Sequence, residues 1–117
     1  MTPTFRDAER LVARYLVHND FRILALNFRR RGTEIDIIAM RKSLLLFVEV
    51  KYRIFTPPVI QELIPFRKQQ AIMRGIDEFK MIFDCTEKDI RVDLALVTGN
   101  TYQQMKIRYQ NHIFQVD

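Results

Sequence analysis

The sequence has few of the residues that build disulfide frameworks, zinc sites and membrane spans. Its 117 residues include one cysteine and two histidines, which excludes an internal disulfide and a zinc centre. The longest uninterrupted apolar run, Leu44–Val48, is far too short to span a bilayer, and the N-terminus lacks a secretory signal pattern. We therefore expect a cytoplasmic protein with no membrane contact, in which Cys85, His18 and His112 have structural or surface positions.

Glycine and proline are also scarce, with three and four residues, and no repeat or linker interrupts the chain. We therefore expect one domain over residues 1–117. Hydrophobic residues form 48% of the composition and charged residues 28%, which is typical of a folded globular protein. The 19 basic residues exceed the 14 acidic ones, giving a net charge of +5. This excess favours a polyanionic partner, and nucleic acid is the first candidate.

Hydrophobic periodicity predicts two helices and five strands. Apolar residues recur at helical spacing over residues 5–16 and again from Pro65 onward. The inner stripe of the second helix is expected to be Ile72, Ile76, Phe79 and Phe83. Strand patterns cover residues 21–28, 34–40, 44–52, 90–98 and 105–109. The resulting order, αβββαββ, predicts an α/β fold in which helices flank a mixed β-sheet.

The strands at 34–40 and 44–52 form a predicted hairpin that brings charged residues together. Because side chains alternate along a strand, Glu34 and Asp36 are expected to share a face with Ile38 and Met40. One register pairs polar with polar and apolar with apolar residues. Its pairs are Met40 with Leu45, Ile38 with Phe47, Asp36 with Glu49, and Glu34 with Lys51. Two directly opposed carboxylates repel each other, so a cation is expected between Asp36 and Glu49.

Asp36 and Glu49 are therefore candidate ligands for a hard cation, Mg²⁺ or Mn²⁺, together with the backbone carbonyl of Val50. Glu9 falls within the apolar arc of the first helix, so its carboxylate is expected to face the sheet and to complete the site. Such an ion would deliver a nucleophilic water to a phosphodiester. Lys51 is expected to stay charged among carboxylates and to stabilise the transition state. These residues predict phosphodiester hydrolysis.

Other polar residues are candidate contacts for a nucleic-acid backbone. Lys68 and Gln69 precede Ile72 by about one turn, on the inward side of the second helix. The candidate nucleic-acid-binding residues are Glu34, Arg31, Arg53, Arg67, Lys68 and Gln69, and the Arg29–Arg31 run would extend the basic track. The structural alternative is a solvated sheet edge with a Glu34–Lys51 ion pair, and Glu9 reaching water. Asp93 is interpreted as a structural partner of Arg91 rather than as a metal ligand.

Several motifs, taken in order, resemble those of the YraN-type family of small bacterial proteins. They are Glu9, Ala13, Tyr15-Leu16, Asn27, the run 31–38, the run 47–53, Lys68-Gln69, the run 91–93 and the run 111–114. The resemblance covers nearly the whole chain. The sequence departs from the family's usual pattern at Thr33 and in the loop 55–58.

The resemblance implies a restriction-endonuclease-like fold and membership of the PD-(D/E)xK nuclease superfamily, similar to archaeal Holliday junction resolvases. It implies that Asp36, Glu49 and Lys51 form the catalytic core and that Glu9 is its helix-one acid. The expected function is a divalent-metal-dependent nuclease that acts on DNA, with branched or single-stranded DNA suggested by analogy. The alternatives are a non-catalytic nucleic-acid-binding accessory protein and a partner-binding domain with a decayed site. A homodimer is left open, because no residue identifies its interface.

Overall fold

The computed structural model describes residues 2–57, 63–84, 88–114 and 116, and its elements follow the expected order. The elements are α1 (Phe5–His18), β1 (Arg22–Arg30), β2 (Thr33–Arg41), β3 (Leu44–Arg53), α2 (Phe66–Phe83), β4 (Asp89–Thr98), the short 3₁₀ helix η2 (Tyr102–Gln104) and β5 (Lys106–Gln110). The predicted order αβββαββ is confirmed. Pro58 and Cys85, for which the sequence predicts a loop and a structural position, lie outside the described residues.

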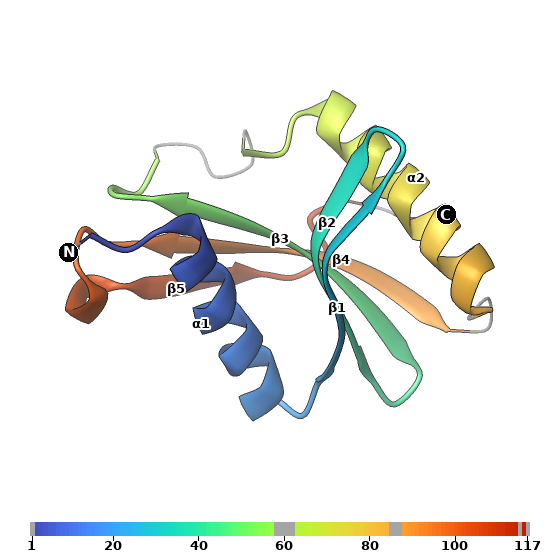
Figure 1. Cartoon of the computed structure of the whole chain (residues 1–117), viewed down its shortest axis with the longest axis horizontal. Helices are drawn as coiled ribbons and strands as arrows, with labels where there is room; N and C mark the ends of the chain where they lie inside the picture. The colour runs from blue at the N-terminus through green and yellow to red at the C-terminus, as the bar shows by residue number, and fades with distance from the viewer. Residues whose placement is uncertain (1, 58–62, 85–87, 115, 117) are drawn as a thin grey trace.

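The five strands form one mixed sheet in the order β1-β2-β3-β4-β5, with a helix on each face (Figure 1). Strands β3 and β4 are parallel, and the other neighbours are antiparallel. One apolar cluster joins Val12 and Leu16 of α1 to Leu46 and Val48 of β3. A second joins α2 to Phe47 and other β3 residues that alternate with the first set. Because alternate residues of a strand point to opposite faces, α1 and α2 cover opposite faces of the sheet.

Local sequence signals explain where the helices begin and end. Thr4 caps α1 in a capping box with Asp7, and the helix ends at Asn19, as the sequence predicts. Pro65 occupies the N-cap of α2 rather than its first turn. Phe83, expected in the core, is 58% exposed because the last turn of α2 leaves its side chain outside the packed core. No helix in the described part of the chain combines the length and apolar composition needed to cross a membrane.

Gly75 lies where α2 approaches β2 most closely. A Cβ atom at this position would lie 2.8 Å from Ile35 Cδ1 and 3.0 Å from Thr33 Oγ1. The Thr33 hydroxyl also donates a hydrogen bond to the Ala71 carbonyl of the same helix. The missing side chain therefore lets α2 pack on β2, which accounts for a glycine within a helix.

The sheet splits into two arms between β2 and β3, and this fork positions the candidate site (Figure 1). The β2–β3 ladder runs from Arg41–Leu44 only as far as Ile37–Val48. Beyond it, β2 continues alongside β1, and β3 continues alongside β4. The predicted pairs Met40–Leu45 and Ile38–Phe47 are confirmed, whereas the ladder contains neither Asp36–Glu49 nor Glu34–Lys51.

The predicted alternation along β2 is also wrong at Asp36. Ile35 and Ile38 both pack in the α2 cluster, whereas Ile37 packs in the α1 cluster. Ile35 and Ile37, which flank Asp36, therefore point to opposite faces of the sheet, whereas a regular strand would place them on the same face. On the adjoining strand β1, Asn27 has a left-handed backbone with φ of +54°. Asn27 lies between Leu26, which pairs with Ile37, and Phe28, which pairs with Ile35, so the left-handed residue lies opposite the change of face.

Candidate metal and catalytic site

Asp36 and Glu49 are buried at the fork, where the two strands separate. Asp36 is 6% exposed and Glu49 is 4% exposed. Asp36 Oδ2 accepts a hydrogen bond of 2.8 Å from the backbone N–H of Val50. The Asp36 carboxylate thus accepts the hydrogen bond that a β2 backbone carbonyl would accept if the β2–β3 ladder continued. Because the N–H and C=O of one strand residue point to the same neighbour, the Val50 carbonyl also faces this side.

Burial and mutual repulsion disfavour two ionised carboxylates at the fork. Burial raises the pKa of Glu49 to about 8, and the charge of Asp36 adds to the effect. Burial also raises the pKa of Asp36, although the hydrogen bond from Val50 opposes the rise. Glu49 Oε2 is buried and has no hydrogen-bond partner in the part of the chain that the structure describes. A nearby cation would relieve both the repulsion and the missing contact.

Two lysines place positive charge beside Glu49. Lys68 Nζ, from the first turns of α2, lies 3.7 Å from Glu49 Oε1. Lys51 is two residues beyond Glu49 on β3, so strand alternation places both on the α2 face. The charges of both lysines lower the pKa of Glu49, but burial outweighs them. The structure thus brings Glu49, Lys51 and Lys68 together, although the sequence offers Lys68 only as a phosphate contact.

Glu9 approaches the fork from the opposite face of the sheet. It is 7% exposed on α1, which confirms that it points inward, and no described residue forms a hydrogen bond with its Oε2. Burial and then the charge of Asp36 raise its pKa, while the Asn27 amide opposes the rise. Within the described residues, no three acidic, histidine or cysteine side chains gather closely enough to hold one ion. Glu9 therefore neighbours the Asp36–Glu49 pair without forming a three-carboxylate cluster.

The donor set at the fork fits Mg²⁺ or Mn²⁺. Asp36, Glu49 and the Val50 carbonyl supply only oxygen atoms, which these hard ions prefer. Mg²⁺ commonly binds one or two carboxylates and retains several waters. The unpartnered Glu49 Oε2 is the atom of this structure that argues most directly for such an ion.

The other predicted nucleic-acid contacts are more dispersed. Arg31, at the β1–β2 turn, Arg53, at the end of β3, and Arg67, on α2, are all exposed. Glu34 pairs with Arg29 of β1 at 3.2 Å instead of with Lys51, because β2 follows β1 beyond the fork. The Gln69 amide donates to the Ile64 carbonyl at 3.1 Å, so its donor already has a partner.

Asp93 has the structural role that the sequence predicts. It is fully buried, and Arg91 lies 3.0 Å from its Oδ1. The Tyr109 hydroxyl and the His112 backbone N–H also donate to this carboxylate, at 2.7 and 3.1 Å. With its acceptors engaged, Asp93 ties β4 to the C-terminal segment.

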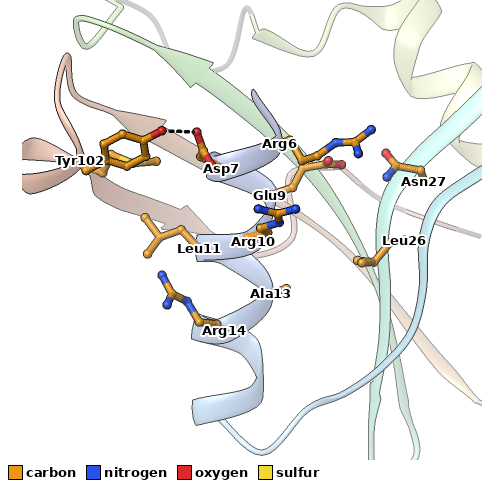
Figure 2. A pocket seen from close by; sticks show the side chains of 11 residues that line it. Arg6, Asp7, Glu9, Arg10, Leu11, Ala13, Arg14, Leu26, Asn27 and Tyr102 are labelled. Carbon is orange, nitrogen blue, oxygen red and sulfur yellow. Dashed lines mark hydrogen bonds between the residues drawn. The ribbon is translucent and has the colours of Figure 1, made fainter. Parts of the chain in front are cut away.

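Sequence reasoning assigned no functional role to four residues that line a cavity next to Glu9 (Figure 2). One is Asn27, whose position inside a strand pattern was a signal for a left-handed residue, because asparagine tolerates that conformation. The others are Arg6, Arg10 and Arg14, spaced four apart on α1. That spacing predicts one exposed basic ridge along a helix.

Comparison with known proteins identifies the family. Residues 8–97 match the model of the uncharacterised protein family UPF0102, and the chain belongs to this family. It is 31% identical over 106 residues to a UPF0102 protein of Chlorobium phaeobacteroides, covering 88% of this chain and 82% of that protein. It is 38% identical over 96 residues to a UPF0102 protein of Pseudothermotoga lettingae, covering 80% and 87% respectively. A UPF0102 protein of Alkaliphilus metalliredigens is 32% identical over 109 residues, covering 91% and 92%.

Proposed function

We propose that this protein is a divalent-metal-dependent nuclease that hydrolyses phosphodiester bonds of nucleic acid, with DNA as the expected substrate. The proposal depends on one observation above all: two buried carboxylates meet at the fork, and Glu49 Oε2 has no hydrogen-bond partner there among the described residues. Burying two like charges side by side is costly even with Lys68 3.7 Å from Glu49, so a structure retains such a pair where a cation or a reaction uses it. The Asp36, Glu49 and Lys51 pattern, typical of the nuclease superfamily that the motifs resemble, supports the same function.

Each residue at the fork has a distinct proposed role. Asp36, Glu49 and the Val50 carbonyl would hold Mg²⁺ or Mn²⁺, which when bound would polarise the phosphodiester and lower the pKa of a water. Lys51 and Lys68 stabilise the negative charge that develops on the phosphate oxygens. Glu9 orients the attacking water from the α1 face through its unpartnered Oε2. Exposed Arg31, Arg53 and Arg67 hold the flanking backbone through charge.

A cleavage panel tests this function. End-labelled single-stranded DNA, duplex DNA, a four-way junction and RNA would each be incubated with the protein and Mg²⁺, Mn²⁺ or chelator. We expect metal-dependent cleavage of at least one substrate, and a loss of at least about 100-fold in Asp36→Asn, Glu49→Ala and Lys51→Ala. Glu78→Gln, a change on a half-buried side of α2 away from the fork, serves as the matched control.

Two results would refute the nuclease. One is cleavage that survives equally in Asp36→Asn and Glu49→Ala, since a contaminating enzyme would give this result. The other is salt-sensitive DNA binding without cleavage under any metal, which would favour the non-catalytic accessory protein. Cytoplasmic location and a homodimer remain predictions that fractionation and ultracentrifugation would check.

A further inference from the structure

A cavity of about 820 Å³ lies beside the fork on the α1 side of the sheet (Figure 2). We call it the α1 cavity. Its lining includes Arg6, Glu9, Arg10 and Arg14 of α1, together with Leu26 and Asn27 of β1. None of the arginines is among the nucleic-acid contacts assigned above. The cavity therefore offers a surface that the proposed reaction does not yet use.

Three guanidinium groups make this cavity suited to an anion. Arg6, Arg10 and Arg14 are exposed, and successive members of the set are separated by a rise of about 6 Å along the helix. In the part of the chain that the structure describes, none of the three forms a salt bridge. The neighbouring carboxylate of Asp7 already accepts hydrogen bonds from Thr4 and Tyr102. The positive charge of the arginines is therefore available to a series of phosphates.

The cavity also has an apolar contact that a bare anion would not use. Leu26 is 54% exposed, although it occupies a strand, and it lies across from Ala13 of α1. Exposed leucine next to arginine suits a ligand that carries both a planar apolar group and a phosphate. A nucleotide has both parts.

The cavity borders the proposed reaction centre at Glu9, the one residue of that centre in its lining. In Figure 2 the Glu9 and Arg6 side chains extend toward Asn27, between α1 and β1. The same Glu9 carboxylate is close enough to Asp36 for that charge to raise its pKa. A strand bound in the cavity would therefore lie beside the fork at Glu9.

We propose that the α1 cavity binds an unpaired segment of nucleic acid, with phosphates on Arg6, Arg10 and Arg14 and a base against Leu26. The inference rests on the proposed nuclease function and names its substrate class: nucleic acid with a single-stranded segment. In a duplex the base faces are covered by stacking, so only an unpaired nucleotide contacts Leu26 in this way. A blunt duplex offers phosphates but no free base.

Binding measured without cleavage tests the cavity separately from the reaction. Fluorescence anisotropy would compare a single-stranded oligonucleotide, a blunt duplex and a duplex with a single-stranded tail, using Asp36→Asn protein in chelator. The Arg10→Ala/Arg14→Ala double variant would be compared with Arg74→Ala/Arg108→Ala, which removes two exposed charges outside the cavity. We expect tighter binding of the single strand and the tailed duplex than of the blunt duplex.

The cavity arginines should account for that preference. Arg10→Ala/Arg14→Ala should weaken single-strand binding by about tenfold or more at low salt and reduce the salt slope by about 1.4, or 0.7 per contact. The control pair should change the slope by less than half as much. Equal losses in both pairs, or a blunt duplex bound as tightly as the single strand, would overturn the inference.

A tryptophan reporter locates the base directly, because the protein has no tryptophan of its own. Leu26→Trp places an indole in the α1 cavity, whereas Leu24→Trp places one on the same strand beside a different cavity, with Phe79 and Phe83. The single-stranded oligonucleotide should quench Leu26→Trp and leave Leu24→Trp nearly unchanged. Similar quenching at both positions, or at neither, would refute this location. Quenching confined to Leu26→Trp in a protein that never cleaves would support the cavity while refuting the nuclease.

Discussion

Glu49→Gln should stabilise the metal-free protein at high pH while it abolishes metal binding. Burial raises the pKa of Glu49 from 4.5 to about 8, so the folded protein resists ionisation that the unfolded chain accepts. Between pH 4.5 and about pH 8, the folded state therefore binds more protons at Glu49 than the unfolded state does. The free energy of unfolding therefore falls as pH rises through this window and is not affected by Glu49 below it. A neutral amide of the same shape removes this dependence.

The magnitude follows from the same pKa. At about 1.4 kcal/mol per pKa unit, the rise to about 8 sets an upper limit of about 5 kcal/mol at pH 9. Water that reaches the carboxylate relieves part of this cost, so the gain should be smaller than the limit. For a chain of 117 residues, each kcal/mol corresponds to about 4 °C in Tm. We expect Glu49→Gln to match the wild type at pH 5 and to melt several degrees higher at pH 9.

Thermal unfolding followed by circular dichroism, in chelator and at a series of pH values, checks this expectation. Glu78→Gln, the same chemical change on a less buried side chain of α2, is the matched control and should not share the pH-dependent gain. Added Mn²⁺ should then raise the Tm of the wild type and leave Glu49→Gln unchanged, since a ligand that binds only the folded state stabilises it. A variant that loses stability equally at pH 5 and pH 9 would refute the argument that Glu49 is strained by burial and repulsion.

Two further predictions concern the packing that holds the fork. Gly75→Ala should lower stability by about 1 to 3 kcal/mol in chemical denaturation, because its Cβ would meet Ile35 Cδ1 at 2.8 Å. Adding Ile35→Val should restore part of the loss, and a Gly75→Ala protein more stable than the wild type would contradict the close approach. Asp93→Ala should cost about 3 to 5 kcal/mol in the same assay, because it leaves Arg91 without its buried partner. Mn²⁺ should still raise the Tm of the Asp93→Ala variant. If the variant kept its stability but lost this rise, Asp93 would instead belong to the metal site.

The sequence predicts the elements of this fold because their signals are local. Apolar spacing marks the two helices, and apolar periodicity marks each strand. The hairpin register near its turn is also predictable, since Met40 with Leu45 and Ile38 with Phe47 satisfy the apolar pattern. These pairs lie close together in the chain. Their hydrophobic pattern therefore contains enough information to select one register.

The fork is less predictable because it depends on the whole sheet. Pairing of β2 with β1 and of β3 with β4 separates the two strands beyond Ile37 and Val48, and no property of the hairpin alone indicates this. Simple alternation paired Glu34 with Lys51, whereas Glu34 turns to Arg29. The sequence nevertheless singles out Asp36 and Glu49 as candidates, since acidic residues in an otherwise apolar hairpin differ from the pattern of core packing.

The fork also explains how the protein tolerates an unfinished ladder in its interior. Separated strands leave backbone groups without partners, and a buried N–H without a partner costs free energy. The Val50 N–H avoids this cost because it donates a hydrogen bond of 2.8 Å to Asp36 Oδ2. One carboxylate therefore completes the backbone hydrogen bonding of β3 and also faces Glu49. Because the same side chain serves the sheet and the candidate site, substitutions of Asp36 should change stability and metal binding together, whereas substitutions of Glu49 should separate them.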